Sequence, residues 1–197
     1  MNVVWITLIL VGCLGAAEVA ARVSGLSAAL SRKLVHTGTA LAACATAVWF
    51  GYRNYIWVGL VFLVLLSAAR RWFPLHSLSD RSESYGEVWF PVGVTLAALV
   101  APTTEVFVAA ILILGVCDTV AYYAGTGIRS PELLFGKTLA GSVGFALVAT
   151  AISAWLVPWP AAMLIGCLSA VAEHLSPRGS DNLTVPVVAS ALLAALV

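Results

Sequence analysis

One aspartate stands in the middle of a long apolar stretch of the sequence. The run 106–128 carries a single formal charge, Asp118, within the segment GVCDTVAYYAGTG. A carboxylate at membrane depth costs about 2.5–3.5 kcal/mol on insertion scales, so such a group is normally paired, protonated or exposed to a water-filled cavity. A functional site around Asp118 is our first hypothesis, and a structural ion pair with Arg32 or Lys137 is the alternative.

Four stretches of the sequence contain the side chains suited to chemistry. They carry Arg32, Lys33 and His36 in SRKLVH; Glu83 and Glu87 in SESYGEVWFPVG; Asp118, Tyr122 and Gly125, followed by GTGIRSPELLFGKTLAGS; and Glu173, His174, Arg178, Asp181 and Asn182 in AEHLSPRGSDNLTVP. Carboxylates bind Mg²⁺, lysines and arginines neutralise phosphate oxygens, and glycines let backbone N–H groups approach them. The sequence has no H-E-x-x-H motif, and its GTG and FGK segments lack P-loop spacing. This inventory predicts phosphoryl transfer at a membrane surface.

The composition predicts the elements that position these residues. Of the 197 residues, 61% are hydrophobic and 10% are charged, which is typical of an integral membrane protein. A membrane-crossing helix needs roughly 20 apolar residues, and Pro158 and Pro160 divide the one uncharged run that is too long for a single helix. We predict an all-α, polytopic protein with a single domain over residues 1–197 and about eight (seven to eight) transmembrane helices. The candidate spans are 3–21, 34–50, 55–69, 88–101, 106–128, 138–157, 160–173 and 183–197.

Basic residues are concentrated on one side of these spans. Nine lie in the alternate loops 22–33, 70–87, 129–137 and 174–182, and Arg53 alone lies opposite. The positive-inside rule places the basic side in the cytoplasm, so the polar stretches face the cytosol and both termini face outward. The formal net charge of +1 gives no basic field that would attract nucleic acid.

Five short motifs resemble those of a known enzyme family. RKLVHTG, YGEVWFPVG, CDTVAYYAGTG, FGKTLAGS and DNLTVP, in this order, resemble the motifs of the dolichol kinase and phytol kinase family of CTP-dependent polyprenol kinases. The resemblance covers residues 32–186. It implies a multi-span helical enzyme that uses a divalent cation to transfer the γ-phosphate of CTP to the hydroxyl of an isoprenoid or other lipid alcohol. Ala140 stands where many family members have a glutamate, and Glu173 or Glu87 is the candidate substitute.

From these motifs and the chemistry of the side chains we predict three groups of site residues. The catalytic residues are Asp118, Lys137, His36 and Arg32. The Mg²⁺ ligands are Asp118, Asp181, Glu87 and Glu173. The residues that contact the phosphates of CTP are Lys33, Gly125, Gly127, Gly136, Thr138, Gly141, Ser142 and Asn182. The alcohol proton passes to His36 or to a carboxylate.

Two other functions are compatible with the same residues. A CDP-lipid synthase also uses CTP and Mg²⁺, but it releases pyrophosphate, and the sequence lacks the denser basic and aspartate-rich terminal signature of that class. A small ion-coupled transporter can use an intramembrane carboxylate such as Asp118 as a relay. The polar residues collect on one side of the spans, which favours chemistry at the surface. The predicted partners are therefore CTP, a lipid alcohol and membrane lipids.

Overall fold

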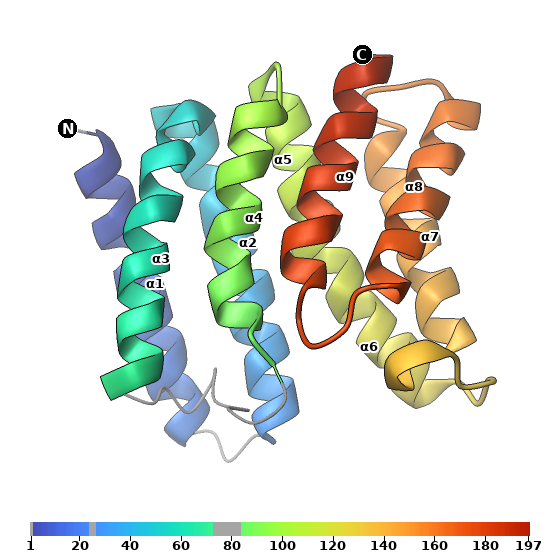
Figure 1. Ribbon diagram of the computed structural model, residues 1–197, viewed down its shortest axis with the longest axis horizontal. Coiled ribbons are helices and arrows are strands. Elements are labelled where there is room, and N and C mark those ends of the chain that lie inside the picture. Colours follow the sequence, from blue (N-terminus) through green and yellow to red (C-terminus); the bar gives the residue numbers. More distant parts are fainter. Residues whose placement is uncertain (1, 24–26, 73–83) are drawn as a thin grey trace.

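The computed structural model describes residues 2–23, 27–72 and 84–197, which are almost entirely helical. The helices are α1 (Asn2–Val23), α2 (Ala28–Phe50), α3 (Tyr55–Trp72), α4 (Gly86–Val100), α5 (Thr104–Leu112), α6 (Asp118–Gly127), α7 (Leu139–Ser153), α8 (Trp159–His174) and α9 (Asp181–Leu196) (Figure 1). The described residues contain no β-strand and only one isolated bridge, between Glu132 and Thr138. The prediction of an all-α fold is confirmed.

Three helical segments are long and apolar enough to cross a membrane. They are Asn2–Ala20, Tyr52–Trp72 and Thr104–Gly127. The last of these joins α5 to α6 through a π-helical turn, Ile113–Cys117. Helices α4, α7 and α9 are apolar but shorter. The membrane character of the chain is supported by these segments, whereas the count of eight spans stays a prediction.

Two prolines separate α7 from α8, as the sequence predicts. Helix α7 ends at Ser153, Pro158 caps the start of α8, and Pro160 is the second residue of α8. Proline has no backbone N–H and its φ is fixed, so it is tolerated in the first turn of a helix and disrupts a helix interior. The long uncharged run therefore forms two helices, which pack against each other.

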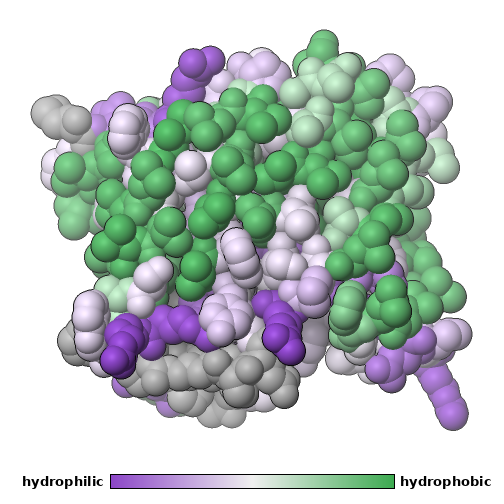
Figure 2. Space-filling model, viewed as in Figure 1, coloured by the Kyte–Doolittle hydropathy of each residue, from purple (hydrophilic) through white to green (hydrophobic). Residues whose placement is uncertain are grey.

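The face of the molecule drawn in Figure 2 is largely apolar. Figure 2 shows hydrophobic side chains over much of this face and hydrophilic residues gathered along its lower edge. Exposed tryptophans lie near the ends of the helices: Trp49, Trp57, Trp155 and Trp159 near the end that contains the chain termini in Figure 1, and Trp72 at the opposite end of α3. Tryptophan is enriched at both membrane–water interfaces, so this distribution suits a bilayer.

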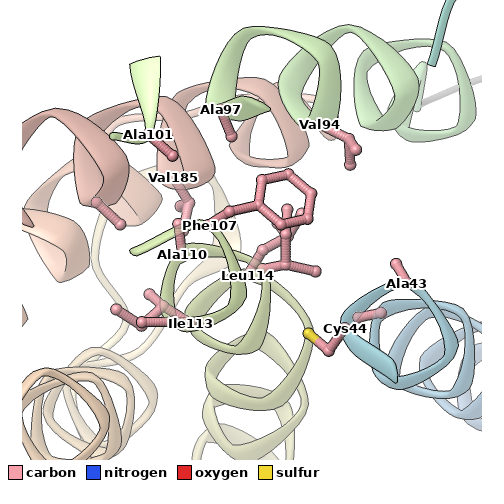
Figure 3. Close-up of a cluster of buried hydrophobic side chains, with 14 of the residues drawn as sticks. Ala43, Cys44, Val94, Ala97, Ala101, Phe107, Ala110, Ile113, Leu114 and Val185 are labelled. Carbon is pink, nitrogen blue, oxygen red and sulfur yellow. The ribbon is translucent and has the colours of Figure 1, made fainter. Parts of the chain in front are cut away.

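The centre of the hydrophobic core is Phe107 on α5 (Figure 3). Its side chain is fully buried, and its ring centroid lies 5.2 Å from that of Tyr55 and 5.8 Å from that of Tyr52. Helices α2, α4 and α9 all pack against α5. The continuous segment from α5 to α6 is therefore a central rod, fixed on several sides, and Asp118 begins its second half.

Candidate active site

The position of Asp118 is set by the π-helical turn that precedes it. The hydroxyl of Thr37 on α2 donates to the carbonyl oxygen of Gly115 in this turn (3.0 Å) and lies 2.6 Å from the hydroxyl of Thr119. A side chain at Gly115 would collide with Ala40 of α2, so the two helices approach closely here. Single π-helical turns within α-helices are frequent at functional sites, because they change the direction in which the next side chains point.

Asp118 forms an ion pair with Lys33 of α2. The ammonium group of Lys33 lies 2.6 Å from Oδ1 and 2.5 Å from Oδ2 of the carboxylate. Nε2 of His36 lies 4.0 Å from Oδ2. His36 and Lys33 are three residues apart on α2, so their side chains share one face of the helix. The aspartate therefore has a basic partner, but this partner is Lys33, and the predicted pairing with Arg32 or Lys137 is wrong.

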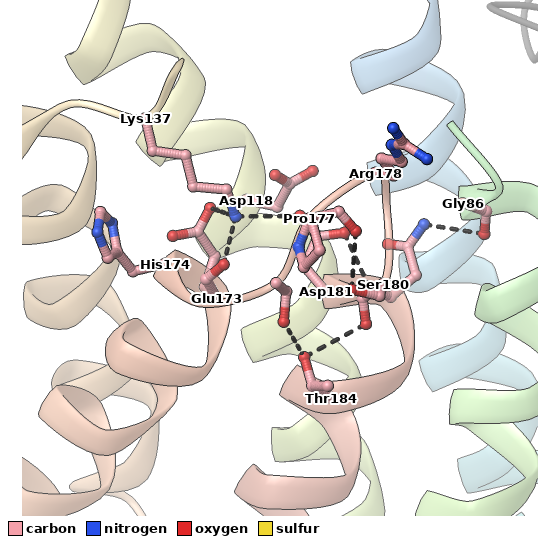
Figure 4. Close-up of polar contacts among 12 residues, drawn as sticks. Gly86, Asp118, Lys137, Glu173, His174, Pro177, Arg178, Ser180, Asp181 and Thr184 are labelled. Carbon is pink, nitrogen blue, oxygen red and sulfur yellow. Dashed lines mark hydrogen bonds and ion pairs between the residues drawn. The ribbon is translucent and has the colours of Figure 1, made fainter. Parts of the chain in front are cut away.

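Lys137 lies at the centre of a second ion-pair group (Figure 4). Its Nζ is 2.7 Å from Oε1 of Glu173 and 3.5 Å from Oδ2 of Asp181, and it also donates to the backbone carbonyl of Glu173. Gly136, directly before the lysine, has a φ of 74°, in the left-handed region that favours glycine. The lysine ends the α6–α7 connection, Glu173 lies near the end of α8, and Asp181 begins α9.

Three carboxylates meet between these two lysines. Oxygen atoms of Asp118, Glu173 and Asp181 all lie within 4.8 Å of one another. Mg²⁺ and Ca²⁺ prefer oxygen ligands, and carboxylates are their usual protein ligands, so this donor set fits a hard divalent cation. Two ammonium groups facing three carboxylates leave a formal excess of negative charge, which also suits a cation.

Glu87, the fourth predicted metal ligand, lies outside this group of three. It pairs with Arg70 near the start of α4. Glu87 lines a cavity next to the three carboxylates but does not belong to their group. Its predicted role as a metal ligand is therefore not supported by its position. Arg81 and Glu83, which belong to the predicted polar loop before α4, lie outside the described residues.

A small cavity of about 240 Å³ opens beside Lys137 and contains most of the predicted phosphate-binding residues. It is lined among others by Lys33, Gly125, Gly136, Thr138, Gly141 and Ser142. Thr138 caps the start of α7 by accepting a hydrogen bond from the N–H of Gly141 (3.2 Å). The Cβ that alanine would add at Gly125 would lie 2.7 Å from the Thr138 hydroxyl, so α6 and α7 are close at this point. Gly127 does not line the cavity, and a Cβ there would have no neighbour within 4 Å in the described part of the chain.

A larger cavity of about 690 Å³ lies on the other side of Asp118. Arg32, His36 and Asn182 line it, and the side-chain amide of Asn182 donates to the carbonyl oxygen of Gly86 (3.0 Å). Lys33, Asp118 and Asp181 line both cavities. The two cavities therefore share a charged wall, and the site residues predicted from distant parts of the sequence come together around it.

Thr37, which the sequence did not single out, lines neither cavity but positions the turn before Asp118. It follows Lys33 by four residues on α2, so the two side chains share a helix face, and this spacing was the available signal. In comparisons with known proteins, no family model, curated protein or solved structure matches the chain. A functional proposal consequently depends on the chemistry and geometry of the site residues and on the motif resemblance.

Proposed function

We propose that this protein is a membrane-embedded kinase that transfers the γ-phosphate of CTP to the hydroxyl of a lipid alcohol of the polyprenol type, such as phytol, farnesol or dolichol. One observation carries the proposal: two lysines and three carboxylates from five separate segments converge at the smaller cavity, and three of them, Lys33, Asp118 and Asp181, also line the larger one. Metal-binding carboxylates together with cationic side chains are what phosphoryl transfer requires, because charge stabilisation and positioning are most of its catalysis.

In the proposed topology the chain crosses the membrane eight times, with α5 and α6 forming one span. The connections after α6 and α8, which contribute Lys137 and Asp181, then lie on the cytoplasmic side. The concentration of basic residues in these loops supports that orientation. Figure 1 shows the α8–α9 connection recessed from the ends of α2 and α6, which suits a site at the level of lipid headgroups.

The side chains divide the work of the reaction. Asp118, Glu173 and Asp181 would hold a Mg²⁺ ion, which when bound would neutralise charge on phosphate oxygens. Lys33 and Lys137 donate hydrogen bonds to the transferring phosphoryl group. The alcohol oxygen forms the new bond to the γ-phosphorus, the bond between that phosphorus and the β-phosphate oxygen breaks, and CDP leaves with the electron pair. The alcohol proton passes to a base of the site. The choice of CTP rests on the motif resemblance.

The test uses the purified protein in lipid with Mg²⁺, a panel of lipid alcohols, and CTP labelled at either the γ or the α phosphate. We compare wild type with Asp118→Asn and with Glu105→Gln, a matched carboxylate-to-amide control that is exposed at the opposite end of the central rod. We expect transfer of the γ label to lipid in wild type and the control, and a loss of about 10²-fold or more in Asp118→Asn, because a transition-state contact is removed.

Other results of the same experiment lead to different conclusions. Transfer of the α label with release of pyrophosphate identifies a cytidylyltransferase instead of a kinase. If neither label reaches any lipid, including when labelled ATP replaces CTP, the kinase proposal is wrong, and ion-coupled transport through Asp118 is the next function to measure. Equal γ transfer by Asp118→Asn and wild type removes Asp118 from the mechanism.

A further inference from the structure

The larger cavity has two ends of opposite chemistry. At one end Lys33 and Asp118 form the charged wall that the cavity shares with the smaller one. Toward α1 and α3 its walls include the side chains of Leu14, Phe62 and Leu66, and Glu87, which pairs with Arg70 of α3, also lines the cavity. Its volume of about 690 Å³ lies within the range of about 300–1,000 Å³ that is usual for small-molecule sites. The cavity is thus shaped for a ligand with one polar and one apolar end.

Helices α1, α2 and α3 build the apolar end. Phe62 and Leu66 are four residues apart on one face of α3, and both are buried, in contrast to the exposed Leu65 between them. Leu14 comes from α1, which packs against α2 and α3. Thr39 also lines the cavity, but its hydroxyl already donates to the carbonyl oxygen of Val35 within α2. These walls suit a hydrocarbon chain, because moving its apolar surface from water into contact with apolar side chains is favourable.

His36 lies where the apolar and charged parts of the cavity meet. Its ring packs edge-on against Phe90, with centroids 5.3 Å apart, and its Nε2 is 4.0 Å from the carboxylate of Asp118. That nitrogen is buried and has no hydrogen-bond partner within the described residues. Buried polar atoms are nearly always hydrogen-bonded, so an unpaired one on a residue that lines a cavity indicates a ligand group. A hydroxyl can donate or accept, so it fits either tautomer of the ring.

We propose that the larger cavity is the acceptor site. It binds an alcohol with a long hydrocarbon chain, whose hydroxyl is hydrogen-bonded to His36 and whose chain lies between α1, α2 and α3. The side chains of Leu14, Phe62 and Leu66 limit the length of chain that is accepted. This inference rests on the proposed function, because an acceptor site presupposes the kinase reaction. The smaller cavity, which is lined by Lys137, then binds the phosphates of the nucleotide.

The first test changes the apolar end of the cavity and measures the chain-length profile. Leu66→Trp places a larger side chain into the cavity, and Leu65→Trp makes the same change on the exposed side of α3. With geraniol, farnesol, geranylgeraniol and longer polyprenols, we expect Leu66→Trp to lower kcat/KM for the longest alcohols about tenfold or more relative to geraniol, because overpacked cavities exclude volume. Leu65→Trp keeps the wild-type profile. An equal effect on every alcohol, or an unchanged profile in a folded Leu66→Trp, overturns the proposal.

The second test needs neither a variant nor catalysis. A farnesol analogue with a photoreactive diazirine in its chain is irradiated with the wild-type protein without nucleotide, and the labelled peptides are identified by mass spectrometry. We expect labelling of α1 and α3 around Leu14 and Phe62. Farnesol competes, whereas farnesene, which lacks the hydroxyl, competes about tenfold more weakly, because the hydrogen bond to His36 is missing.

The outcomes separate this inference from the proposed function. Labelling of α1 and α3 without any phosphate transfer means that the cavity binds the alcohol and the kinase proposal is wrong. Phosphate transfer with labelling elsewhere, or with equal competition by farnesene, means that the kinase proposal stands and the assigned acceptor site is wrong.

Discussion

The close crossing of α4 and α9 provides a sharp test of how the fold positions the site. Gly93 of α4 faces the first turns of α9, where an added Cβ would lie 2.9 Å from Cα of Leu183 and closer still to the carbonyl oxygen of Asn182. Both of these are backbone atoms, which cannot rotate away. Gly93→Ala therefore has to displace the start of α9, which carries Asp181.

The size of the effect follows from these distances. Ordinary van der Waals contact begins at 3.4 Å, so the backbone at Leu183 has to retreat by at least 0.5 Å, and Asn182 by more. Overpacking costs about 1–3 kcal/mol, whereas replacing glycine by alanine inside a helix returns about 1 kcal/mol, so we expect a net destabilisation of about 0–2 kcal/mol. A misplacement of about 1 Å at a catalytic group can lower a rate 10²-fold. We therefore expect phosphate transfer to fall about 10- to 100-fold in a protein that is destabilised by no more than about 2 kcal/mol.

The assay combines γ-phosphate transfer with thermal unfolding in the same detergent. Gly38→Ala on α2 is the matched control, because a Cβ there has no neighbour within 4 Å in the described part of the chain. We expect the control to transfer phosphate at the wild-type rate and to unfold at the same or a higher temperature. If Gly93→Ala is as active as Gly38→Ala, the packing of α4 on α9 does not position Asp181, and the reasoning is refuted.

Three further predictions concern the anchoring and the charges of the site. Thr37→Val leaves the Gly115 carbonyl without its side-chain donor and is expected to destabilise the protein by about 1–3 kcal/mol and to lower phosphate transfer. Thr37→Ser keeps the hydroxyl and is expected to keep wild-type stability and transfer. Thermal unfolding and the transfer assay test this. Lys137→Met removes the ammonium group that pairs with Glu173 and Asp181. We expect transfer to be lost and Mn²⁺ to bind about tenfold more tightly without nucleotide, as measured by electron paramagnetic resonance. An unchanged Mn²⁺ affinity contradicts the assigned cluster. Chelation of divalent ions is expected to stop transfer reversibly and to lower the unfolding temperature, because a cation bound to the native carboxylates stabilises the folded protein by mass action; an unchanged unfolding temperature contradicts a metal held by this cluster.

The helices were predictable because each follows from local sequence. Apolar runs bounded by polar residues indicate the helices, and Pro158 and Pro160 interrupt the helix at the place where they occur in the chain. The division of the rod at the π-helical turn was not predictable, because it depends on the contact of Gly115 with α2. Apolar length alone also does not decide the number of spans, since α4, α7 and α9 are short.

The members of the site were more predictable than their pairing. Asp118 and Lys137 stand out because charges are rare in their surroundings, and both line the site. Which lysine pairs with Asp118 depends on the register of α2 against the central rod, and the structure selects Lys33. The sequence left Glu173 and Glu87 as alternatives, and Glu173 is the one beside Asp118 and Asp181 because the short α8–α9 connection brings the end of α8 to the start of α9.

The ion pair between Lys33 and Asp118 has a consequence for how the chain is made. The lysine is 85 residues earlier in the sequence, so during synthesis α2 emerges well before the segment that contains the aspartate. In the proposed topology, Asp118 reaches the bilayer when its counter-ion is already there. Because the proposed site lies at the level of lipid headgroups, inserting Asp118 costs less than the value of about 2.5–3.5 kcal/mol for a carboxylate at the bilayer centre, and docking of the rod on α2 offsets part of that cost. In that topology, the order of the chain brings the lysine to the membrane before the aspartate with which it pairs.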